Sequence, residues 1–275
     1  MRIKTAFDLA VEHLSHIENP SLEAGYLLAA MLKQDRSYIY SHFEELLDDT
    51  LTETFKSWIQ KRAEGMPLAY LVGEKTFWEY DFRVTQDTLI PRPETELLVE
   101  AALKFLPKDV AISVADLGTG SGAVAVVLKK MRPNWEVYGV DSSNAALKIA
   151  EENASKLGVK VNFAAGHWSS EFPAASMDAL VSNPPYLREN DPHLKGEIAF
   201  EPRSALVAGK DGLDAYREIL EDSKRVLKPE GFLFFEHGYN QAQALIALLQ
   251  SNNFFVVKSI VDYQRHPRII VAQMI

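Results

Sequence analysis

The sequence predicts an α/β fold, because short apolar segments typical of buried strands alternate with amphipathic helical segments along most of the chain. Two further observations divide the chain. Residues 1–73 show almost only helical patterns, and residues 74–92 contain the alternation of a β-hairpin. We therefore expect an N-terminal helical-bundle domain over 1–73, a β-hairpin linker over 74–92 and an α/β domain over 93–275.

The helical patterns of residues 1–64 come in three segments. Apolar side chains recur at helical spacing before and after Pro20, and Thr50-Leu-Thr-Glu53 has the form of a capping box that opens the third segment. No residue pattern here indicates chemistry. We expect a small bundle that serves for recognition or as a scaffold.

Residues 65–92 have a different character. Gly65-Met-Pro67 interrupts the helical pattern, and residues 77–84 alternate large apolar with polar side chains, as a strand or hairpin does. Pro91 and Pro93 then stiffen the entry to a helix near Glu94. We place the domain boundary at this point.

From residue 93 onward strands and helices alternate. We expect strands over 111–117, 136–140, 160–164, 178–182 and 231–236, and helices near 94–105, 121–131, 143–157, 213–227 and 240–250. Residues 254–261 and 269–274 form two more strands with no helix between them, which indicates an antiparallel pair. This order predicts a sheet with helices on both faces.

Composition and charge exclude several classes. The 275 residues include no cysteine, so disulfides and thiolate metal sites are excluded, and the seven histidines show no metal-binding spacing. No apolar run reaches the roughly 18–20 residues that span a bilayer, and the N-terminus has an amphipathic pattern rather than that of a signal peptide. We expect a cytoplasmic protein with no membrane contact and no metal. The net charge of −9 disfavours nucleic acid as a direct substrate.

A glycine-rich turn follows the first predicted strand of the α/β domain. Val114-Ala-Asp-Leu-Gly-Thr-Gly-Ser-Gly122 runs from an apolar strand into a helix-forming segment, so its glycines let the backbone approach a ligand at a helix N-terminus. The candidate cofactor-binding residues of the turn are Gly118, Thr119, Gly120, Ser121 and Gly122. Asp141 ends the next predicted strand, where a carboxylate can accept both hydroxyls of a ribose. This arrangement predicts a nucleoside site in a Rossmann-like, doubly wound sheet.

The glycine turn alone leaves two cofactors open. Gly118-x-Gly120-x-x-Ala123 also fits a relaxed dinucleotide fingerprint, so a nicotinamide-dependent enzyme is an alternative. Asp116, just before the turn, would repel a pyrophosphate but attract the ammonium and sulfonium groups of S-adenosylmethionine. The position of Asp116 favours a methyltransferase.

Asn183-Pro-Pro-Tyr186 follows the fourth predicted strand. Pro184 and Pro185 fix φ and remove two backbone donors, which leaves a rigid turn. The side-chain oxygen of Asn183 and the carbonyl of Pro184 can each accept one N–H of a planar amino group, and Tyr186 can stack on its plane. These four residues are the candidate catalytic residues, and we also expect Asn183 to contact the cofactor. By itself the tetrapeptide fits a proline-stiffened connection equally well.

Together these motifs resemble those of the amino-group methyltransferases. Ile90-Pro-Arg-Pro-Glu-Thr-Glu96, Phe200-Glu-Pro202, Asp211-Gly-Leu213 and Glu236-x-Gly238 with Gln241 are similar to the bacterial peptide chain release factor glutamine methyltransferases. The resemblance extends from about residue 65 to the C-terminus. It implies a class I methyltransferase sheet, S-adenosylmethionine as cofactor, and release factors as protein substrates with a Gly-Gly-Gln target.

The resemblance also implies roles for single residues. Trp168 stands where relatives place a side chain against adenine, Glu201 would support the Asn183 loop, and Arg92 would hold that loop or the substrate. Relatives usually have an acid at the position of His167, so we expect no ligand contact there. Between Asp262 and Arg268 the chain lacks a glycine that is common in relatives.

Three alternatives remain. The same tetrapeptide serves adenine methyltransferases of DNA or RNA. Ribosomal-protein glutamine methyltransferases resemble this chain too, but usually have a serine where Pro93 stands. A module that binds S-adenosylmethionine without catalysis is the third, and the intact Asn183 loop disfavours it.

Overall fold

The computed structural model describes residues 1–275, which form two compact units. The first unit comprises Met1–Glu74 and Lys195–Phe200, and the second comprises Lys75–Leu194 and Glu201–Ile275. No helix in either unit combines the length and the apolar character needed to cross a lipid bilayer.

The first unit is a helical bundle. Its helices are α1 (Ile3–His13), α2 (Pro20–Leu32), α3 (Arg36–Ser41), α4 (Asp49–Ala63) and α5 (Leu68–Val72). They enclose one apolar core, in which Ile3, Leu28 and Phe55 are fully buried. Each long helix contributes one apolar stripe to this core, as its spacing predicts.

The start of α4 differs from the prediction. Asp48, not Thr50, is the N-cap residue, and its side chain accepts a hydrogen bond from the backbone N–H of Leu51 at 2.7 Å. Asp48 lies two residues before the predicted capping box, and aspartate caps a helix as well as threonine does. Thr50 therefore lies inside the first turn.

The segment 195–200 joins the first unit through a buried guanidinium. Arg62 of α4 forms ion pairs with Glu23 of α2 at 2.8 Å and with Glu197 of the 3-10 turn η2 (Gly196–Phe200) at 2.6 Å. The side chain of Arg62 is only 5% exposed, so its charge depends on these two carboxylates. Nothing in the sequence pattern predicted that residues 195–200 belong to the first unit.

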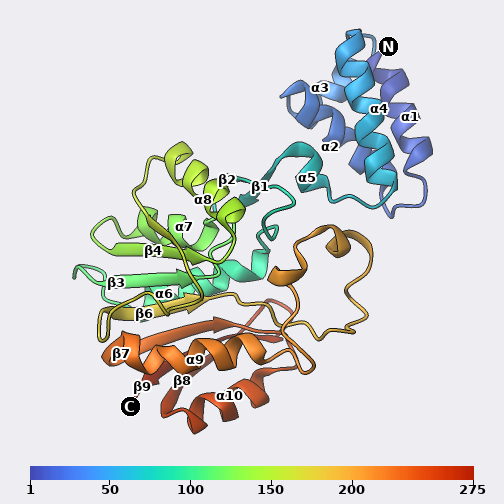
Figure 1. Ribbon diagram of the computed structural model, residues 1–275. Helices are drawn as coiled ribbons and strands as arrows, with labels where there is room; N and C mark the ends of the chain where they lie inside the picture. Colours follow the sequence, from blue (N-terminus) through green and yellow to red (C-terminus); the bar gives the residue numbers. More distant parts are fainter. The chain divides into compact units, whose positions relative to one another are not determined.

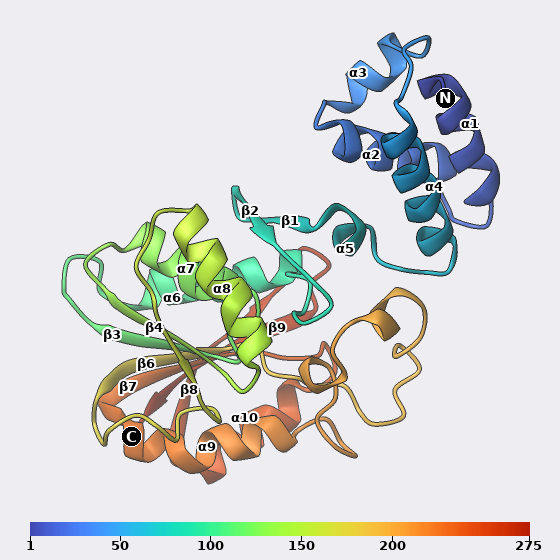
Figure 2. The same ribbon diagram turned by 45° about the horizontal axis from the view of Figure 1, so that its top comes forward.

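The second unit contains a seven-stranded sheet (Figures 1 and 2). Its strands are β3 (Ser113–Leu117), β4 (Glu136–Asp141), β5 (Asn162–Ala165), β6 (Met177–Ser182), β7 (Leu227–Glu236), β8 (Phe254–Val261) and β9 (Pro267–Met274). The spatial order is β5-β4-β3-β6-β7-β9-β8. The first five are parallel, whereas β9 is antiparallel to both β7 and β8. The predicted antiparallel pair is confirmed.

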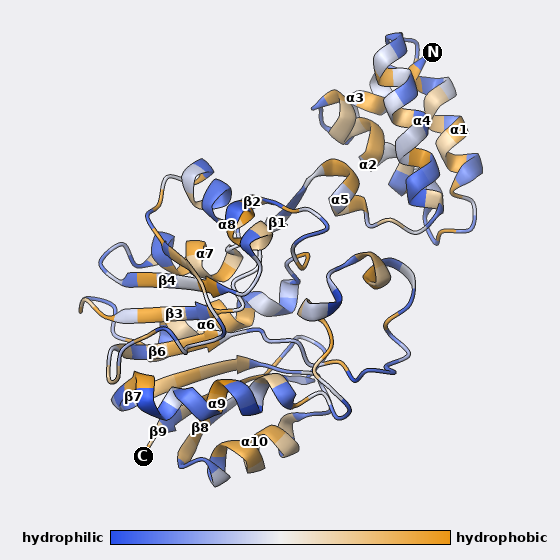
Figure 3. Ribbon diagram, viewed as in Figure 1, coloured by the Kyte–Doolittle hydropathy of each residue, from blue (hydrophilic) through white to orange (hydrophobic).

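Helices cover both faces of this sheet (Figure 1). They are α6 (Glu96–Phe105), α7 (Ala123–Met131) and α8 (Asn144–Lys156) on one face, and α9 (Asp214–Val226) and α10 (Ala242–Ser251) on the other. Alternate strand residues divide between the two cores: Val114 faces the first and Ala115 the second. Figure 3 shows both hydrophilic and hydrophobic residues along α9, as a helix with one buried face requires.

The predicted linker packs on the second unit. The hairpin of β1 (Glu74–Phe77) and β2 (Tyr80–Arg83) buries Phe77 and Phe82 in the first of these cores. Asn153 of α8 accepts a hydrogen bond from Arg83 N at 2.7 Å and donates one to Arg83 O at 3.0 Å. These contacts place the chain that leaves the hairpin beside the carboxyl ends of the parallel strands, where residues 86–89 line a cavity.

Candidate active site

A cavity of about 560 Å³ lies at the carboxyl ends of β3, β4 and β6, within the second unit. This volume is in the range of small-molecule and cofactor sites, and the position is where open α/β sheets bind ligands. Its walls are formed by residues 86–89, the glycine turn, the end of β4, the loop after β5, the Asn183 loop, residues 202–209 and the first turns of α9.

The glycine turn meets the cavity at two residues. Gly118 and Gly120 line it with φ angles of +72° and +55°, in the region that favours glycine. The backbone N–H groups of Gly118 and Thr119 donate to Val140 O at 2.8 and 2.9 Å, which fixes the turn against β4. Thr119 is buried beneath the wall.

The other two turn residues serve packing. A Cβ atom on Gly122 would lie 2.9 Å from the Cβ of Ala150, so glycine at this position lets α7 approach α8. Ser121 is buried, and its carbonyl accepts a hydrogen bond from Asn153 at 2.9 Å. Direct ligand contacts by Thr119, Ser121 and Gly122 stay predictions.

Asp141 lines the cavity with its carboxylate held in place. Its Oδ2 accepts a hydrogen bond from Gly120 N at 2.9 Å, and its Oδ1 accepts one from Ser143 N at 2.9 Å. A carboxylate has further lone pairs, so both oxygens keep the capacity to accept a ligand hydroxyl. This geometry suits the ribose contact expected of Asp141.

Asp116 lies below the turn and is not part of the cavity wall. It is 2% exposed and accepts hydrogen bonds from Thr119 Oγ1 at 2.6 Å and Ala125 N at 3.2 Å. Burial raises the pKa of its carboxyl to about 7, and these hydrogen bonds oppose the rise. Asp116 therefore shapes the turn and the start of α7, and its expected contact with a ligand cation stays a prediction.

Trp168 lines the cavity in the loop after β5. Its indole Nε1 donates to Glu218 Oε2 on α9 at 2.8 Å, and a Cβ on Gly118 would lie 3.3 Å from the Trp168 ring. The ring therefore packs over the glycine turn. His167 also lines the cavity, with its Nε2 3.4 Å from Glu218 Oε2, although we expected no ligand contact at this position.

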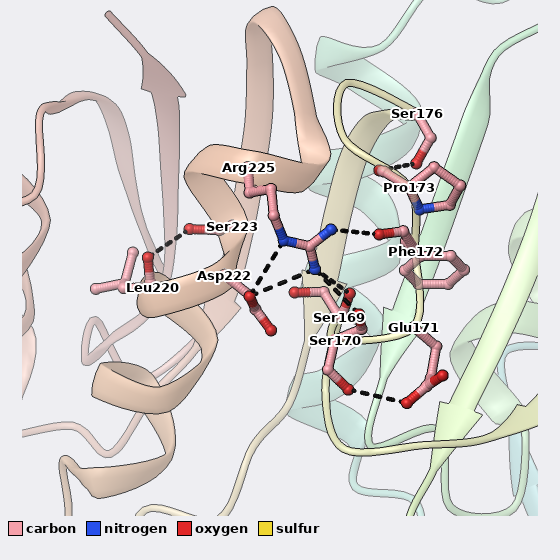
Figure 4. Close-up of polar contacts among 10 residues, drawn as sticks. All are labelled: Ser169, Ser170, Glu171, Phe172, Pro173, Ser176, Leu220, Asp222, Ser223 and Arg225. Carbon is pink, nitrogen blue, oxygen red and sulfur yellow. Dashed lines mark hydrogen bonds and ion pairs between the residues drawn. The ribbon is translucent and has the colours of Figure 1, made fainter.

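Arg225, in the last turn of α9, holds this loop from the other side (Figure 4). Its guanidinium donates to the carbonyl oxygens of Phe172 at 2.6 Å, Ser170 at 3.0 Å and Ser169 at 3.5 Å. Asp222 lies 3.4 Å from the same guanidinium. A single side chain thus satisfies three loop carbonyls and fixes the loop that presents Trp168.

The Asn183 loop leaves β6 at the cavity, where Asn183 and Pro185 contribute to the wall. Asn183 Nδ2 donates to Thr95 Oγ1 at 3.1 Å, which leaves the side-chain oxygen to accept from a ligand. Pro184 is buried and Tyr186 is partly buried, and neither side chain is part of the wall, so the substrate contacts expected of the Pro184 carbonyl and of Tyr186 stay predictions. Burial also raises the pKa of Tyr186, so its hydroxyl stays protonated.

Arg92 and Glu201 form an ion pair outside the cavity wall. Glu201 is buried and also accepts a hydrogen bond from Ile90 N at 3.0 Å. The pair therefore fastens the segment 90–92 to residue 201, rather than bonding to residues 183–186. The substrate roles expected of Arg92 and Glu201 stay predictions.

Gln241 connects the Asn183 loop with the segments around Gly212 and Gly238. We expected no particular role for this glutamine from the sequence. Its Oε1 accepts from Gly238 N at 3.0 Å, and its Nε2 donates to Tyr186 O at 3.0 Å and Gly212 O at 3.1 Å. Gly212 has no room for a side chain, because a Cβ would lie 2.3 Å from Tyr186 O. The signal in the sequence was the presence of Gln241 just after Glu236-x-Gly238, together with the motifs that contain Tyr186 and Gly212.

The charge of the wall decides which ligands it suits. The ionisable lining residues other than His167 are Asp87, Asp141, Asp214 and Glu218, and no lysine or arginine is among the lining residues. An anionic wall attracts cationic groups and repels phosphates. The cavity therefore suits a nucleoside with positive charge and disfavours a dinucleotide or a nucleic-acid backbone.

Comparison with known proteins agrees with this geometry. Residues 94–209 match the methyltransferase small domain and residues 5–73 match the PrmC N-terminal domain. The chain is 42% identical over 257 residues to the release factor glutamine methyltransferase of Coxiella burnetii (strain RSA 493 / Nine Mile phase I), covering 93% of this chain and 92% of the relative. The chain belongs to the release factor glutamine methyltransferase family. A second family member, from Xylella fastidiosa (strain 9a5c), is 42% identical over 92% of each chain.

Solved structures show the same fold outside this family. The ribosomal protein L11 methylase from Lactobacillus delbrueckii subsp. bulgaricus has a TM-score of 0.51 and 18% identity, over 67% of this chain and 81% of that one. The predicted class I methyltransferase sheet is confirmed, and family membership excludes the nicotinamide-dependent alternative.

As a member of the release factor glutamine methyltransferase family, the protein uses S-adenosylmethionine. The cavity fits this cofactor: Asp141 can hold the ribose, Trp168 can cover the adenine, and the anionic wall suits the sulfonium and ammonium groups. The glycine turn provides the close backbone approach.

Proposed function

We propose that this protein transfers a methyl group from S-adenosylmethionine to the side-chain amide nitrogen of the glutamine in the Gly-Gly-Gln motif of peptide chain release factors, and so modulates translation termination. Curated relatives that match more than 90% of the chain are named release factor glutamine methyltransferases. The observation that carries the proposal is the place of Asn183, which lines an anionic cavity and whose side-chain nitrogen is bonded to Thr95, so that its oxygen is left to accept from a substrate.

The chemistry depends on orientation, because an amide nitrogen is a poor nucleophile whose lone pair is delocalised into the carbonyl. S-adenosylmethionine supplies an electrophilic methyl group. Asn183 Oδ1 and the carbonyl of Pro184 each accept one N–H of the substrate amide and hold its nitrogen in line. Such positioning can be worth roughly 7–11 kcal/mol. Accepting both N–H groups also raises electron density on the nitrogen, and no general base is required if the proton leaves after methyl transfer.

The substrate is a protein rather than a nucleic acid, as the net charge of −9 and the absence of lysine and arginine from the cavity wall support. Pro93 supports a release factor rather than a ribosomal protein. A glycine-rich loop is flexible enough to enter a narrow pocket that a packed side chain could not reach. Release factors act on ribosomes, so we propose a cytoplasmic location.

The test uses purified protein, a labelled methyl donor and three acceptors: a release factor, adenine-containing duplex DNA and a ribosomal protein. We expect label only on the release factor, with mass spectrometry locating one methyl group on the Gly-Gly-Gln peptide. A release factor that stays unmodified while another acceptor gains a methyl group would contradict the proposal.

The Asn183→Ala variant tests the mechanism in the same assay. We expect turnover to fall by about two orders of magnitude, because a preorganised polar contact to the reacting group is lost. The affinity for S-adenosylmethionine and the midpoint of thermal unfolding serve as controls for folding. Near-normal turnover would exclude Asn183 as the orienting residue.

A further inference from the structure

The hydroxyl of Thr95 contacts the side chain on which the proposed reaction depends. Asn183 Nδ2 donates to Thr95 Oγ1 at 3.1 Å, and Thr95 is 5% exposed. Thr95 ends the 3-10 turn η1 (Pro93–Thr95) before α6, and it is not part of the cavity wall. It therefore acts on Asn183 from behind the wall.

The direction of this hydrogen bond matters, because an amide side chain is nearly symmetric in shape but not in chemistry. With Nδ2 bonded to Thr95, Asn183 presents Oδ1, an acceptor, to the N–H groups of a substrate amide. If the Asn183 amide rotated by half a turn, it would present Nδ2 to the substrate N–H groups. Both groups are donors, so no hydrogen bond would form. Thr95 holds the productive orientation only while its oxygen accepts, so its own proton needs another acceptor.

Glu236 provides that acceptor. The Thr95 side chain hydrogen-bonds the Glu236 carboxyl, and Glu236 Oε2 is buried without a hydrogen-bond partner in the protein. Glu236 ends β7, beside β6, because Ser182 pairs with Phe235 in the parallel ladder. Asn183 and Glu236 therefore lie side by side at the ends of two adjacent strands, and Thr95 contacts both.

The protonation state of Glu236 decides the direction of the chain of hydrogen bonds. An ionised carboxylate can only accept from Thr95, whereas a protonated carboxyl can donate to Thr95 and turn the Thr95 proton toward Asn183. Burial, the largest influence, raises the pKa of Glu236 to about 7.

Other charged and titratable groups also face Glu236. Arg268 of β9 and Arg92 before α6 favour its ionised form, and Glu94 opposes that form. Tyr186 of the Asn183 loop and Tyr216 of α9 also face it. Burial raises the pKa of both phenols, and the Glu236 charge adds to that rise.

We propose that Thr95 and Glu236 are positioning residues that hold Asn183 with Oδ1 toward the substrate amide, through hydrogen bonds from Asn183 Nδ2 to Thr95 Oγ1 and from the Thr95 hydroxyl to the Glu236 carboxylate. This inference rests on the proposed glutamine methylation. It adds that turnover requires Glu236 in its ionised form.

The first test needs no substrate. The ¹⁵N side-chain amide signal of Asn183, assigned by its absence in Asn183→Ala, is followed by NMR as a function of pH. We expect its chemical shift to change with a midpoint near pH 7 in the wild type and to lose this change in both Glu236→Gln and Thr95→Val. The same titration in either variant would overturn the inference, whether or not the release factor proves to be the substrate.

The second test separates positioning from structure. Thr95→Val removes the hydroxyl at nearly constant volume, so we expect kcat to fall about tenfold, the value of one lost hydrogen bond. KM and the dissociation constant of S-adenosylmethionine should stay within about twofold. Thr95→Ser keeps the hydroxyl and should restore most of kcat, and Glu236→Gln should remove the rise of kcat through pH 7.

Ser223→Ala is the matched control, because it removes a buried hydroxyl that bonds only to Leu220 O within α9. It should leave kcat unchanged. A wild-type kcat in Thr95→Val, or an equal loss in Thr95→Ser, would overturn the inference.

Discussion

The carboxylate of Asp141 is held by the backbone and lines the cavity, where we expect it to bind a ribose. Each oxygen accepts one backbone N–H, from Gly120 and Ser143, so the side chain is fixed before a ligand arrives. Asp141 lines the cavity, and its carboxylate has further lone pairs that can accept from a ligand. Binding therefore costs little side-chain ordering, which favours affinity.

Replacing Asp141 by alanine should weaken binding of S-adenosylmethionine by roughly 1–3 kcal/mol, because charge-assisted hydrogen bonds to the ribose are lost. Isothermal titration calorimetry measures the change. Glu136→Gln, at the opposite end of the same strand, is the control and should bind as the wild type does. Unchanged affinity in Asp141→Ala would remove this carboxylate from the site.

We expect Asp116 to make the free energy of unfolding depend on pH. Its pKa is raised from 3.8 to about 7 in the folded protein by burial, so its stabilising effect is full below pH 4 and is lost as pH rises toward and through 7. Asp116→Asn removes this dependence. The free energy of unfolding of the variant minus that of the wild type should therefore increase between pH 4 and 7, by up to about 4 kcal/mol.

Urea unfolding at a series of pH values measures this difference. Glu236 acts in the same pH range, but it is present in both proteins and cancels in the comparison. The exposed Glu100→Gln is the control for removal of a carboxylate. A difference that does not change with pH would contradict the prediction.

The site residues that follow strand ends could be predicted from the sequence, whereas the residues that support them could not. Asp141 and Asn183 each follow an apolar strand, so their place at the carboxyl edge could be predicted. Thr95 is 88 residues from Asn183, and Glu218 is 50 residues from Trp168. Contacts at such separations depend on how the sheet and helices pack, which no local pattern encodes.

At the scale of elements, α9 positions the loop that carries Trp168. Glu218 and Arg225 are seven residues apart on this helix, about two turns, so they lie on one face. The first accepts from the Trp168 indole, and the second binds the carbonyls of the following residues (Figure 4). The helix therefore fixes both ends of the segment 168–172.

Arg225→Met should loosen this loop without unfolding the protein, because the lost side-chain contacts are to carbonyl oxygens of the loop rather than to apolar core side chains. We expect faster amide hydrogen exchange in residues 167–173 and a several-fold weaker affinity for S-adenosylmethionine. The neighbouring exposed Lys224→Met is the control and should change neither quantity. Unaltered exchange in Arg225→Met would show that the loop is held by other contacts.

The elements themselves followed the sequence closely, and the exceptions have local causes. We predicted a strand from residue 231, but β7 begins at Leu227. Pro229 and Gly231 indicated a turn, and the structure accommodates them in an irregularity of the ladder, where Leu227 pairs with Met177 and Phe232 with Ala179. Glu230 has a φ of +63° at this bulge.

At the scale of the molecule, each unit has its own apolar core. The core of the first unit comes entirely from residues before Glu74, and all the residues that line the cavity belong to the second unit. The sequence indicated the helical part because its period changes near residue 65. It did not indicate that residues 195–200 belong with that part, since this short segment joins it through Arg62 and Glu197, 135 residues apart.

This separation of cores leads to a prediction for a variant that contains residues 75–275. It should bind S-adenosylmethionine with near wild-type affinity, because it keeps the complete cavity. It should also methylate a short peptide that contains Gly-Gly-Gln. Methylation of the intact release factor should be lost, because a three-residue loop offers far less than the roughly 1,200–2,000 Å² that specific protein interfaces bury. Calorimetry and mass spectrometry measure the three quantities, and equal methylation of the intact factor by both proteins would show that the helical bundle does not hold the substrate.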